Sequence, residues 1–320
     1  MRWQVKAAVQ RALSAVPRGA ELNYLLQRHV THGLPASDWH LLRHADEARR
    51  HLEAYERHSP APRTTTELDA FEFGAGWDLV GPLSLWSLGV ERQTLVDIYP
   101  HVRWELVNDA LARLHAHHDE LAATAGRPLR RPDPAPLGDL VTLQRRFGIR
   151  YLAPCDARAT GLAAASFDLV SSTFTLEHIP AADVAAILRE CARLLRPDGV
   201  TTGSVGLEDH YAFDDPRISV YNFLRYTERR WRLVNSALHH QNRLRARDYL
   251  QLAGAAGLTV LDADAAVPGP ERLSALDTLP LAEPFASGYT RAELGATELF
   301  LVAGLDAAQV AERLDELRRR

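Results

Sequence analysis

Two glycines followed by an aspartate give the strongest constraint on the fold. Gly74 and Gly76 follow an apolar run that ends at Phe73, and Asp97 ends a second apolar run. Glycine lets the backbone turn sharply and approach a ligand closely, and an aspartate at the end of the second strand can accept hydrogen bonds from two ribose hydroxyls. The order strand, glycine turn, helix, strand and acid therefore predicts the first half of a nucleotide-binding βαβ unit.

The spacing of these residues bears on whether the ligand is a dinucleotide. A dinucleotide fingerprint of the form GxGxxG would have its third glycine at position 79, where this sequence has Leu79. Glu72 lies directly before the turn, where its carboxylate would repel a pyrophosphate but could receive an ammonium group, directly or through water. An amino acid joined to a ribose and a base, as in S-adenosylmethionine, fits this arrangement.

At these positions the sequence resembles the class I S-adenosylmethionine-dependent methyltransferases, bacterial small-molecule type. The family pattern is an acid, then GxGxG, then an acid at the end of the second strand; Asp78 here replaces the last glycine. The resemblance implies S-adenosyl-L-methionine as cofactor and S-adenosyl-L-homocysteine as product. In this part of the chain it implies the cofactor-binding residues Glu72, Phe73, Gly74, Ala75, Gly76, Asp97 and Ile98.

Later segments carry the resemblance further, in the expected order. Residues 149–153 form a short apolar run before Asp156 and Ala157; the resemblance implies that Asp156 accepts a hydrogen bond from the adenine amino group and that Ala157 packs near the base. Residues 166–173 resemble the fourth strand, and Thr173 and the loop after it would lie beneath the sulfonium. Residues 194–200 resemble the turn into a fifth strand, with Asp198 where the family usually has glycine.

The resemblance implies an α/β, Rossmann-like fold with a seven-stranded, mostly parallel sheet in the order 3-2-1-4-5-7-6 and helices on both faces. The apolar pattern places the last two strands at 258–267 and 298–303, and helices at 102–125, 137–147 and 181–195. Helical spacing also predicts an N-terminal helical cap over residues 1–62. The methyltransferase domain would then span 63–320, with a substrate-recognition insertion at about 207–247.

This insertion is dense in aromatic and polar residues and follows the carboxyl end of the fifth strand, where ligands bind in open α/β sheets. Arginines beside aromatic residues could hold a carboxylate or phosphate of the acceptor. The candidate substrate-binding residues are Tyr211, Tyr221, Arg225, Trp231, Asn242 and Arg243.

His210 is the first candidate for a general base, with the adjacent Asp209 as its acid partner, and His178 is the second. Each has a structural alternative: the Asp209–His210 pair could brace its loop, and Glu177 with His178 could cap the next helix. No metal site is predicted. The histidines at 115, 117 and 118 lack the spacing of a zinc motif and suit a solvated helix face.

A sulfonium methyl is already activated, so the protein must hold the acceptor in line with the carbon–sulfur bond and exclude water. We therefore expect SN2 methyl transfer to a small-molecule acceptor, with an oxygen as the first choice and N- or C-methyl transfer open. Two other classes remain as alternatives. One is an NAD(P)-dependent oxidoreductase on a related sheet, which Leu79 and the Asp156–Ala157 pair oppose. The other is a non-catalytic partner subunit that keeps the methyltransferase fold.

Composition limits the remaining possibilities. The 320 residues carry a net charge of -4, which gives no general electrostatic reason to expect nucleic-acid binding and disfavours an RNA methyltransferase. The two cysteines argue against a disulfide framework, and no apolar run approaches the roughly 20 residues of a membrane span. The expectation is a cytoplasmic enzyme of small-molecule or secondary metabolism. The helical start and residues 307–320 are candidate homodimer contacts.

Overall fold

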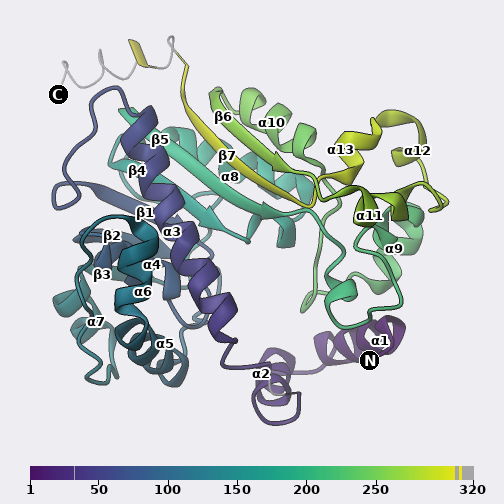
Figure 1. The fold of residues 1–320 in the computed structure, drawn as a ribbon, viewed down its shortest axis with the longest axis horizontal. Helices are drawn as coiled ribbons and strands as arrows, with labels where there is room; N and C mark the ends of the chain where they lie inside the picture. Colours follow the sequence, from purple (N-terminus) through teal and green to yellow (C-terminus); the bar gives the residue numbers. More distant parts are fainter. Residues whose placement is uncertain (32, 307–309, 312–320) are drawn as a thin grey trace.

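A seven-stranded sheet forms the centre of the molecule in the computed structural model, which describes residues 1–31, 33–306 and 310–311 (Figure 1). The strand order is β3-β2-β1-β4-β5-β7-β6. β7 runs antiparallel to β5 and β6, whereas the other neighbours are parallel. The predicted sheet is confirmed. The strands are β1 Asp69–Phe73, β2 Arg92–Val96, β3 Ile149–Leu152, β4 Phe167–Thr173, β5 Leu195–Gly206, β6 Leu258–Ala266 and β7 Glu298–Leu305.

Helices cover both faces of this sheet (Figure 1). α3, α4, α5 and α7 pack against one face in two apolar clusters, and α8 and α10 pack against the other. Because both faces are covered, β4 is buried along nearly its whole length. The longer helices of the sheet layers are α3 Asp38–His58, α4 Val80–Ser87, α5 Trp104–Ala116, α6 His118–Ala125, α7 Leu140–Phe147, α8 Ala181–Leu194 and α10 Ala246–Ala255.

The N-terminal segment is helical, as predicted, but its three helices have different neighbours. α3 packs directly on the sheet: its Leu52 is fully buried, and both ring nitrogens of His51 lie within hydrogen-bonding distance of hydroxyls, 2.8 Å from Thr202 and 3.1 Å from Thr173. α1 (Trp3–Ser14) and α2 (Gly19–His29) lie away from the sheet. α3 therefore shares the core of the sheet. The proposed domain boundary at residue 62 stays a prediction.

The insertion after β5 folds against α1 in a separate apolar cluster. Trp3 packs on Tyr211 with 5.5 Å between ring centroids and on Tyr226 with 5.8 Å. The backbone N–H of Trp3 donates to Asp215 at 2.9 Å, and Lys6 pairs with Asp214. The short elements of this region and of the segment before β7 are η2 His210–Phe213, η3 Asn222–Arg225, α9 Glu228–Val234, α11 Pro270–Leu273, η4 Ser274–Leu276, α12 Phe285–Gly288 and α13 Arg291–Gly295.

Three predicted boundaries differ from the structure. The helix predicted over 102–125 is split into α5 and α6, because His117 leaves the helical region of the backbone. The helix predicted from residue 137 begins at Leu140, where Asp139 caps it by accepting from the Thr142 N–H at 2.7 Å. β5 begins at Leu195, inside the segment predicted as a turn: Phe167 pairs with Leu195 and Leu169 with Val200, so the pairing register shifts across residues 196–199.

In the part of the chain that the structure describes, no helix combines the length and the apolar character of a membrane-crossing segment. Of the predicted C-terminal dimer segment, residues 307–309 and 312–320 lie outside the described residues.

Candidate active site

The turn between β1 and α4 has the backbone that its glycines predict. Gly74 has φ +74° and Gly76 has φ +73°, in the left-handed region that side chains disfavour. A Cβ on Gly74 would lie 2.3 Å from the side chain of Thr175, whereas a Cβ on Gly76 would meet nothing within 4 Å. The turn therefore packs closely against the loop after β4 at Gly74 and leaves open space at Gly76.

Leu79 explains how this turn forms without a third glycine. Leu79 itself adopts a left-handed conformation with φ 56°, and its side chain is fully buried in the cluster under α4. Asp78 accepts from the backbone N–H of Val80 at 3.3 Å and thereby satisfies one free donor at the start of α4. Burial of a leucine side chain offsets the backbone cost that glycine would avoid.

Glu72 lies at the end of β1 with only 5% of its surface exposed. Among the residues that the structure describes, no hydrogen bond or ion pair reaches its carboxylate. Burial raises the pKa of Glu72 to about 8, because an unpaired carboxylate is costly in an apolar surrounding. A ligand ammonium group would compensate this buried carboxylate.

Asp97 lies at the end of β2, beside the turn. Its carboxylate accepts from the Tyr99 N–H at 3.3 Å. Burial raises the pKa of Asp97, although His101 and nearby backbone N–H groups, including that of Gly76, act to lower it. Ile98 follows it and is 51% exposed. An acceptor flanked by an exposed apolar side chain suits a ribose and the edge of a base.

Asp156 and Ala157 follow β3, next to the end of β2. The Cys155 N–H donates to the carbonyl of Asp97 at 2.8 Å, which joins the two strand ends. Asp156 receives the Arg158 guanidinium on both carboxylate oxygens, and this lowers its pKa. Ala157 packs at the margin of the sheet cluster. Asp156 is thus an ionised acceptor that Arg158 holds in place.

The remaining predicted cofactor residues contribute mainly through the backbone. Phe73 and Ala75 point into the apolar clusters. Thr173 is tied to His51 through its hydroxyl. The partnerless Glu72 carboxylate, the open space at Gly76 and the acceptor at Asp97 together fit an aminoacyl-ribose-base molecule such as S-adenosylmethionine.

A cavity of about 720 Å³ opens next to this turn, beyond the ends of β4, β5 and β7. Phe174 lines the cavity, and its neighbour Thr175 touches Gly74, so the cavity adjoins the turn directly. The lining residues are Trp39, His40, Arg43, His44, Phe174, Glu177, His178, Gly206, Glu208, His210, Phe213, Arg272, Thr297 and Glu298.

The two predicted base candidates meet in this cavity. The rings of His178 and His210 are 4.9 Å apart, and His210 also stacks on Phe213 at 5.2 Å. The surrounding protein lowers the pKa of both imidazoles, mainly by desolvation, so both are neutral near pH 7. His178 Nδ1 lies 2.9 Å from the carbonyl of His240. Because a carbonyl only accepts, this nitrogen carries the proton and Nε2 keeps a lone pair.

Glu177 is buried beside these rings. One carboxylate oxygen accepts from the Gly206 N–H at 3.0 Å, whereas the other has no hydrogen-bond partner among the described residues. Burial raises the pKa of Glu177 to about 8. The structural alternative of a helix cap at Glu177 and His178 does not hold, since α8 begins after them at Ala181 and Pro180 precedes it as the cap residue.

Asp209 does not reach the cavity. Its carboxylate is fully buried inside the insertion, where it accepts from the Tyr211 N–H and from Asn222, each at 2.9 Å. This placement argues against the predicted catalytic role of Asp209 and favours the loop brace.

Most of the predicted substrate-binding side chains have internal partners. Tyr211, Tyr221 and Trp231 donate to the carbonyls of residues 234, 295 and 241 and belong to the cluster under α1. Arg243 is buried against the Phe223 carbonyl and pairs with Glu228. Arg225 is exposed outside the cavity lining. These positions argue against substrate binding, because the polar groups of the buried residues are already satisfied within the insertion.

Asn242 makes three hydrogen bonds to the loop after β4. Its amide donates to the carbonyls of Leu176 and Ile179, both at 2.8 Å, and its backbone N–H donates to the carbonyl of Glu177 at 2.7 Å. Asn242 therefore fixes the loop that carries Glu177 and His178, and its contact with a substrate stays a prediction.

The sequence-based prediction missed the wall of the cavity that α3 supplies. Trp39, His40, Arg43 and His44 occupy its first turns, and Arg43 stacks over Phe174 at 4.8 Å from the ring centroid. The sequence shows a Trp-His-x-x-Arg-His pattern of polar and aromatic residues at positions 39–44. No feature of the neighbouring sequence indicates that this end of the helix faces the loop after β4.

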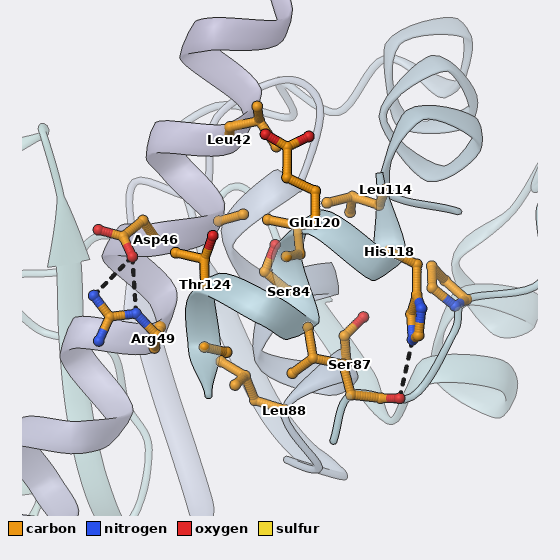
Figure 2. Close-up of a pocket in the computed structure, with 15 residues that line it drawn as sticks. Leu42, Asp46, Arg49, Ser84, Ser87, Leu88, Leu114, His118, Glu120 and Thr124 are labelled. Carbon is orange, nitrogen blue, oxygen red and sulfur yellow. Dashed lines mark hydrogen bonds and ion pairs between the residues drawn. The ribbon is translucent and has the colours of Figure 1, made fainter. Parts of the chain in front are cut away.

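A second pocket lies between α3, α4 and α6 and measures about 80 Å³ (Figure 2). Its walls carry the Asp46–Arg49 ion pair and the His118 ring, which lies 3.1 Å from the Leu129 carbonyl. It is too small for a substrate and contains none of the predicted site residues, so the larger cavity is the candidate active site.

The chain was compared with known protein families, curated proteins and solved structures. Residues 140–202 match a family model described as a methyltransferase domain. A search of curated proteins found no match. The structure is similar to 1,6-didemethyltoxoflavin-N1-methyltransferase from Burkholderia thailandensis, with 16% identity, 95% of this chain and 90% of that chain covered, and a TM-score of 0.47.

It is also similar to a TehB-like SAM-dependent methyltransferase from Corynebacterium glutamicum, with 13% identity, 91% and 100% coverage of this chain and that chain, and a TM-score of 0.43. A third similar structure is geranyl diphosphate C-methyltransferase from Streptomyces coelicolor, with 11% identity, 86% coverage of each chain and a TM-score of 0.44.

The strand order is that of the class I methyltransferase fold, and the match over residues 140–202 supports a methyltransferase enzyme. The methyltransferase match and the turn at Gly74 and Gly76 together support S-adenosylmethionine as the cofactor.

Proposed function

We propose that the enzyme transfers the methyl group to an oxygen of a small hydroxylated aromatic molecule held in the 720 Å³ cavity. The observation that carries this proposal is the pair of neutral imidazoles, His178 and His210, beside the turn at Gly74 and Gly76. A hydroxyl must lose its proton to become a strong nucleophile, and a neutral imidazole in the cavity can accept it.

The composition of the cavity wall supports an aromatic acceptor. Trp39, Phe174 and Phe213 present three rings to the cavity, and Trp39 and Phe213 are exposed at 60% and 66%. Aromatic pairs add about 0.5–1.5 kcal/mol beyond the burial of their area. The two arginines of the wall are paired, Arg43 with Glu298 and Arg272 with Glu208, which supports a ligand without a strong negative charge.

The cofactor, when bound, supplies a methyl group activated by a sulfonium. Glu72 would receive its ammonium group, Asp97 its ribose hydroxyls and Asp156 its adenine amino group. The loop after β4 lies between this turn and the cavity, so an acceptor that rests on Phe174 would face the methyl group. His210 takes the hydroxyl proton, with His178 as second candidate, while the aromatic wall holds the acceptor in line and limits water.

Trp39→Ala tests the cavity as the acceptor site. With radiolabelled cofactor and a panel of phenols, catechols and hydroxybenzoates, we expect methyl ether products from the wild type, identified by mass spectrometry. In Trp39→Ala the acceptor KM should rise about 3- to 10-fold, the loss of one aromatic contact. The affinity for S-adenosylhomocysteine should not change, because Trp39 lies outside the cofactor turn.

Val141→Ala is the matched surface control, since Val141 is 73% exposed on α7. A product with the methyl group on nitrogen or carbon would contradict the oxygen assignment. An unchanged KM in Trp39→Ala, or no product from any aromatic acceptor while the cofactor product still binds, would contradict the aromatic acceptor.

A further inference from the structure

We propose that Glu177, His178 and His210 form a binding site for a divalent transition-metal ion at the base of the cavity. One ligand atom from each residue lies within 4.8 Å of the other two. Three ligands of one ion at roughly 2.1 Å in tetrahedral geometry are about 3.4 Å apart, so side-chain rotations that move each ligand atom by up to about 1 Å close the site. The sequence predicted no metal here, because the residues come from two separate segments.

The side chains are oriented as metal ligands are. His178 donates its Nδ1–H to the His240 carbonyl, which fixes the tautomer and leaves Nε2 free. Glu177 is held through one oxygen by the Gly206 N–H. A Cβ built on Gly206 would lie 2.9 Å from that oxygen of Glu177 and 3.4 Å from Nε2 of His210, so glycine leaves room for the two side chains to meet.

The second carboxylate oxygen of Glu177 is available to bind a cation. Glu177 is 2% exposed, and this oxygen has no hydrogen-bond partner among the described residues. A buried carboxylate is costly unless it is paired or coordinates a metal. The two arginines that line the cavity are engaged elsewhere, Arg43 with Glu298 and Arg272 with Glu208.

The donor set selects the kind of ion. Two imidazole nitrogens and one carboxylate oxygen suit Zn²⁺, Co²⁺ or Ni²⁺, whereas Mg²⁺ prefers oxygen ligands alone. Three protein ligands with an open position are typical of catalytic metal sites. The exposure of His178 to the cavity leaves that position accessible to a small molecule.

A metal ion here would change how the acceptor loses its proton, a role that rests on the proposed oxygen transfer. The ion would lower the pKa of an acceptor hydroxyl in its coordination sphere, and the proton would leave to solvent instead of to His210. The oxygen then forms the new bond to the methyl carbon, the carbon–sulfur bond breaks, and sulfur keeps the electron pair. Metal binding itself does not depend on that reaction.

Titration of the chelator-treated protein with Co²⁺ tests the site. We expect one equivalent to bind with micromolar affinity and to give visible absorption bands of a nitrogen- and oxygen-ligated ion, with Zn²⁺ displacing it and Mg²⁺ failing to compete. Glu177→Gln and His210→Gln should each weaken Co²⁺ binding by at least 10-fold, since each removes one of three ligands. Both should keep S-adenosylhomocysteine binding.

His117→Gln is the control, because His117 pairs with Glu120 on a distant, solvated helix end and should leave Co²⁺ binding unchanged. No stoichiometric binding by the wild type would overturn the proposal, as would unchanged binding in a folded Glu177→Gln or His210→Gln variant. If Co²⁺ does not bind but aromatic hydroxyls are still methylated, the metal proposal fails and the proposed function stands. If Co²⁺ binds but no aromatic hydroxyl is methylated, the metal proposal stands and the proposed function fails.

Discussion

Glu72→Gln is expected to stabilise the fold at pH 8 and to weaken S-adenosylhomocysteine binding by about 10- to 100-fold. The pKa of Glu72 lies at about 8 in the folded protein against an ordinary value of 4.5, so the folded state holds a proton that the unfolded state loses. Stability from this group is complete below about pH 4.5 and is lost as the pH rises towards 8, by up to about 1.4 kcal/mol per unit. Glutamine removes that loss.

The binding effect has the opposite sign because the ligand ammonium group needs the ionised carboxylate. A hydrogen bond to a charged group contributes about 1.5–3 kcal/mol, which sets the expected loss of affinity. The affinity for S-adenosylhomocysteine, measured by calorimetry, should rise from pH 6 to pH 8 in the wild type and stay constant in the variant. Urea denaturation measures the free energy of unfolding of both proteins. Glu67→Gln, at an exposed acid, is the control. A variant that is less stable at pH 8, or that binds normally, would contradict the role of Glu72.

Arg245→Met is expected to lower the free energy of unfolding by about 3–5 kcal/mol. Arg245 is fully buried, and burial lowers its pKa to about 10. It donates to the carbonyls of Leu207 at 2.7 Å and Leu294 at 2.9 Å, and also to that of Ala296. Methionine fills the space but leaves these buried acceptors without a donor, each at a cost of about 1–3 kcal/mol.

The same arginine joins the exit of β5 to the entry of β7, the two strand ends that carry part of the cavity. Urea denaturation of Arg245→Met and of the exposed control Arg229→Met measures the effect. We expect no loss for the control. A loss below about 1 kcal/mol in Arg245→Met would mean that the carbonyls find other partners.

The placement of the candidate cofactor residues could be predicted from the sequence because these residues lie at strand ends. Glu72 and Asp97 each close a short apolar run, and a parallel sheet brings the carboxyl ends of β1 and β2 to one edge. The glycine turn is equally local, since the conformation at Gly74 and Gly76 depends on neighbouring residues. The strand order was predicted from the family resemblance alone, and not from the pattern of the residues.

The acceptor side could not be predicted in the same way. Trp39 and Arg43 reach the cavity from the first turns of α3, 30 and 26 residues before β1, and only tertiary packing decides which end of that helix faces the loop after β4. The structure argues against the predicted substrate-binding role of Tyr221 and Trp231, which lie in a small core with α1. A sequence rich in aromatic residues looks the same whether the rings bind a substrate or form such a core. Their donor partners are backbone carbonyls, which sequence does not reveal.

Calorimetric titration with S-adenosylhomocysteine and, separately, NADH tests the central claim most directly, using Gly76→Ala and Gly126→Ala as a matched pair. Both glycines have positive φ, +73° and +60°, and neither added Cβ would meet an atom within 4 Å. Each variant should therefore lose a similar 1–2 kcal/mol of stability. Only the Cβ at position 76 would enter the space beside Asp97 that we assign to the cofactor.

The account predicts micromolar binding of S-adenosylhomocysteine by the wild type and Gly126→Ala, at least 10-fold weaker binding by Gly76→Ala, and no heat from NADH. Binding of NADH without S-adenosylhomocysteine, or equal binding by the two variants, would contradict it.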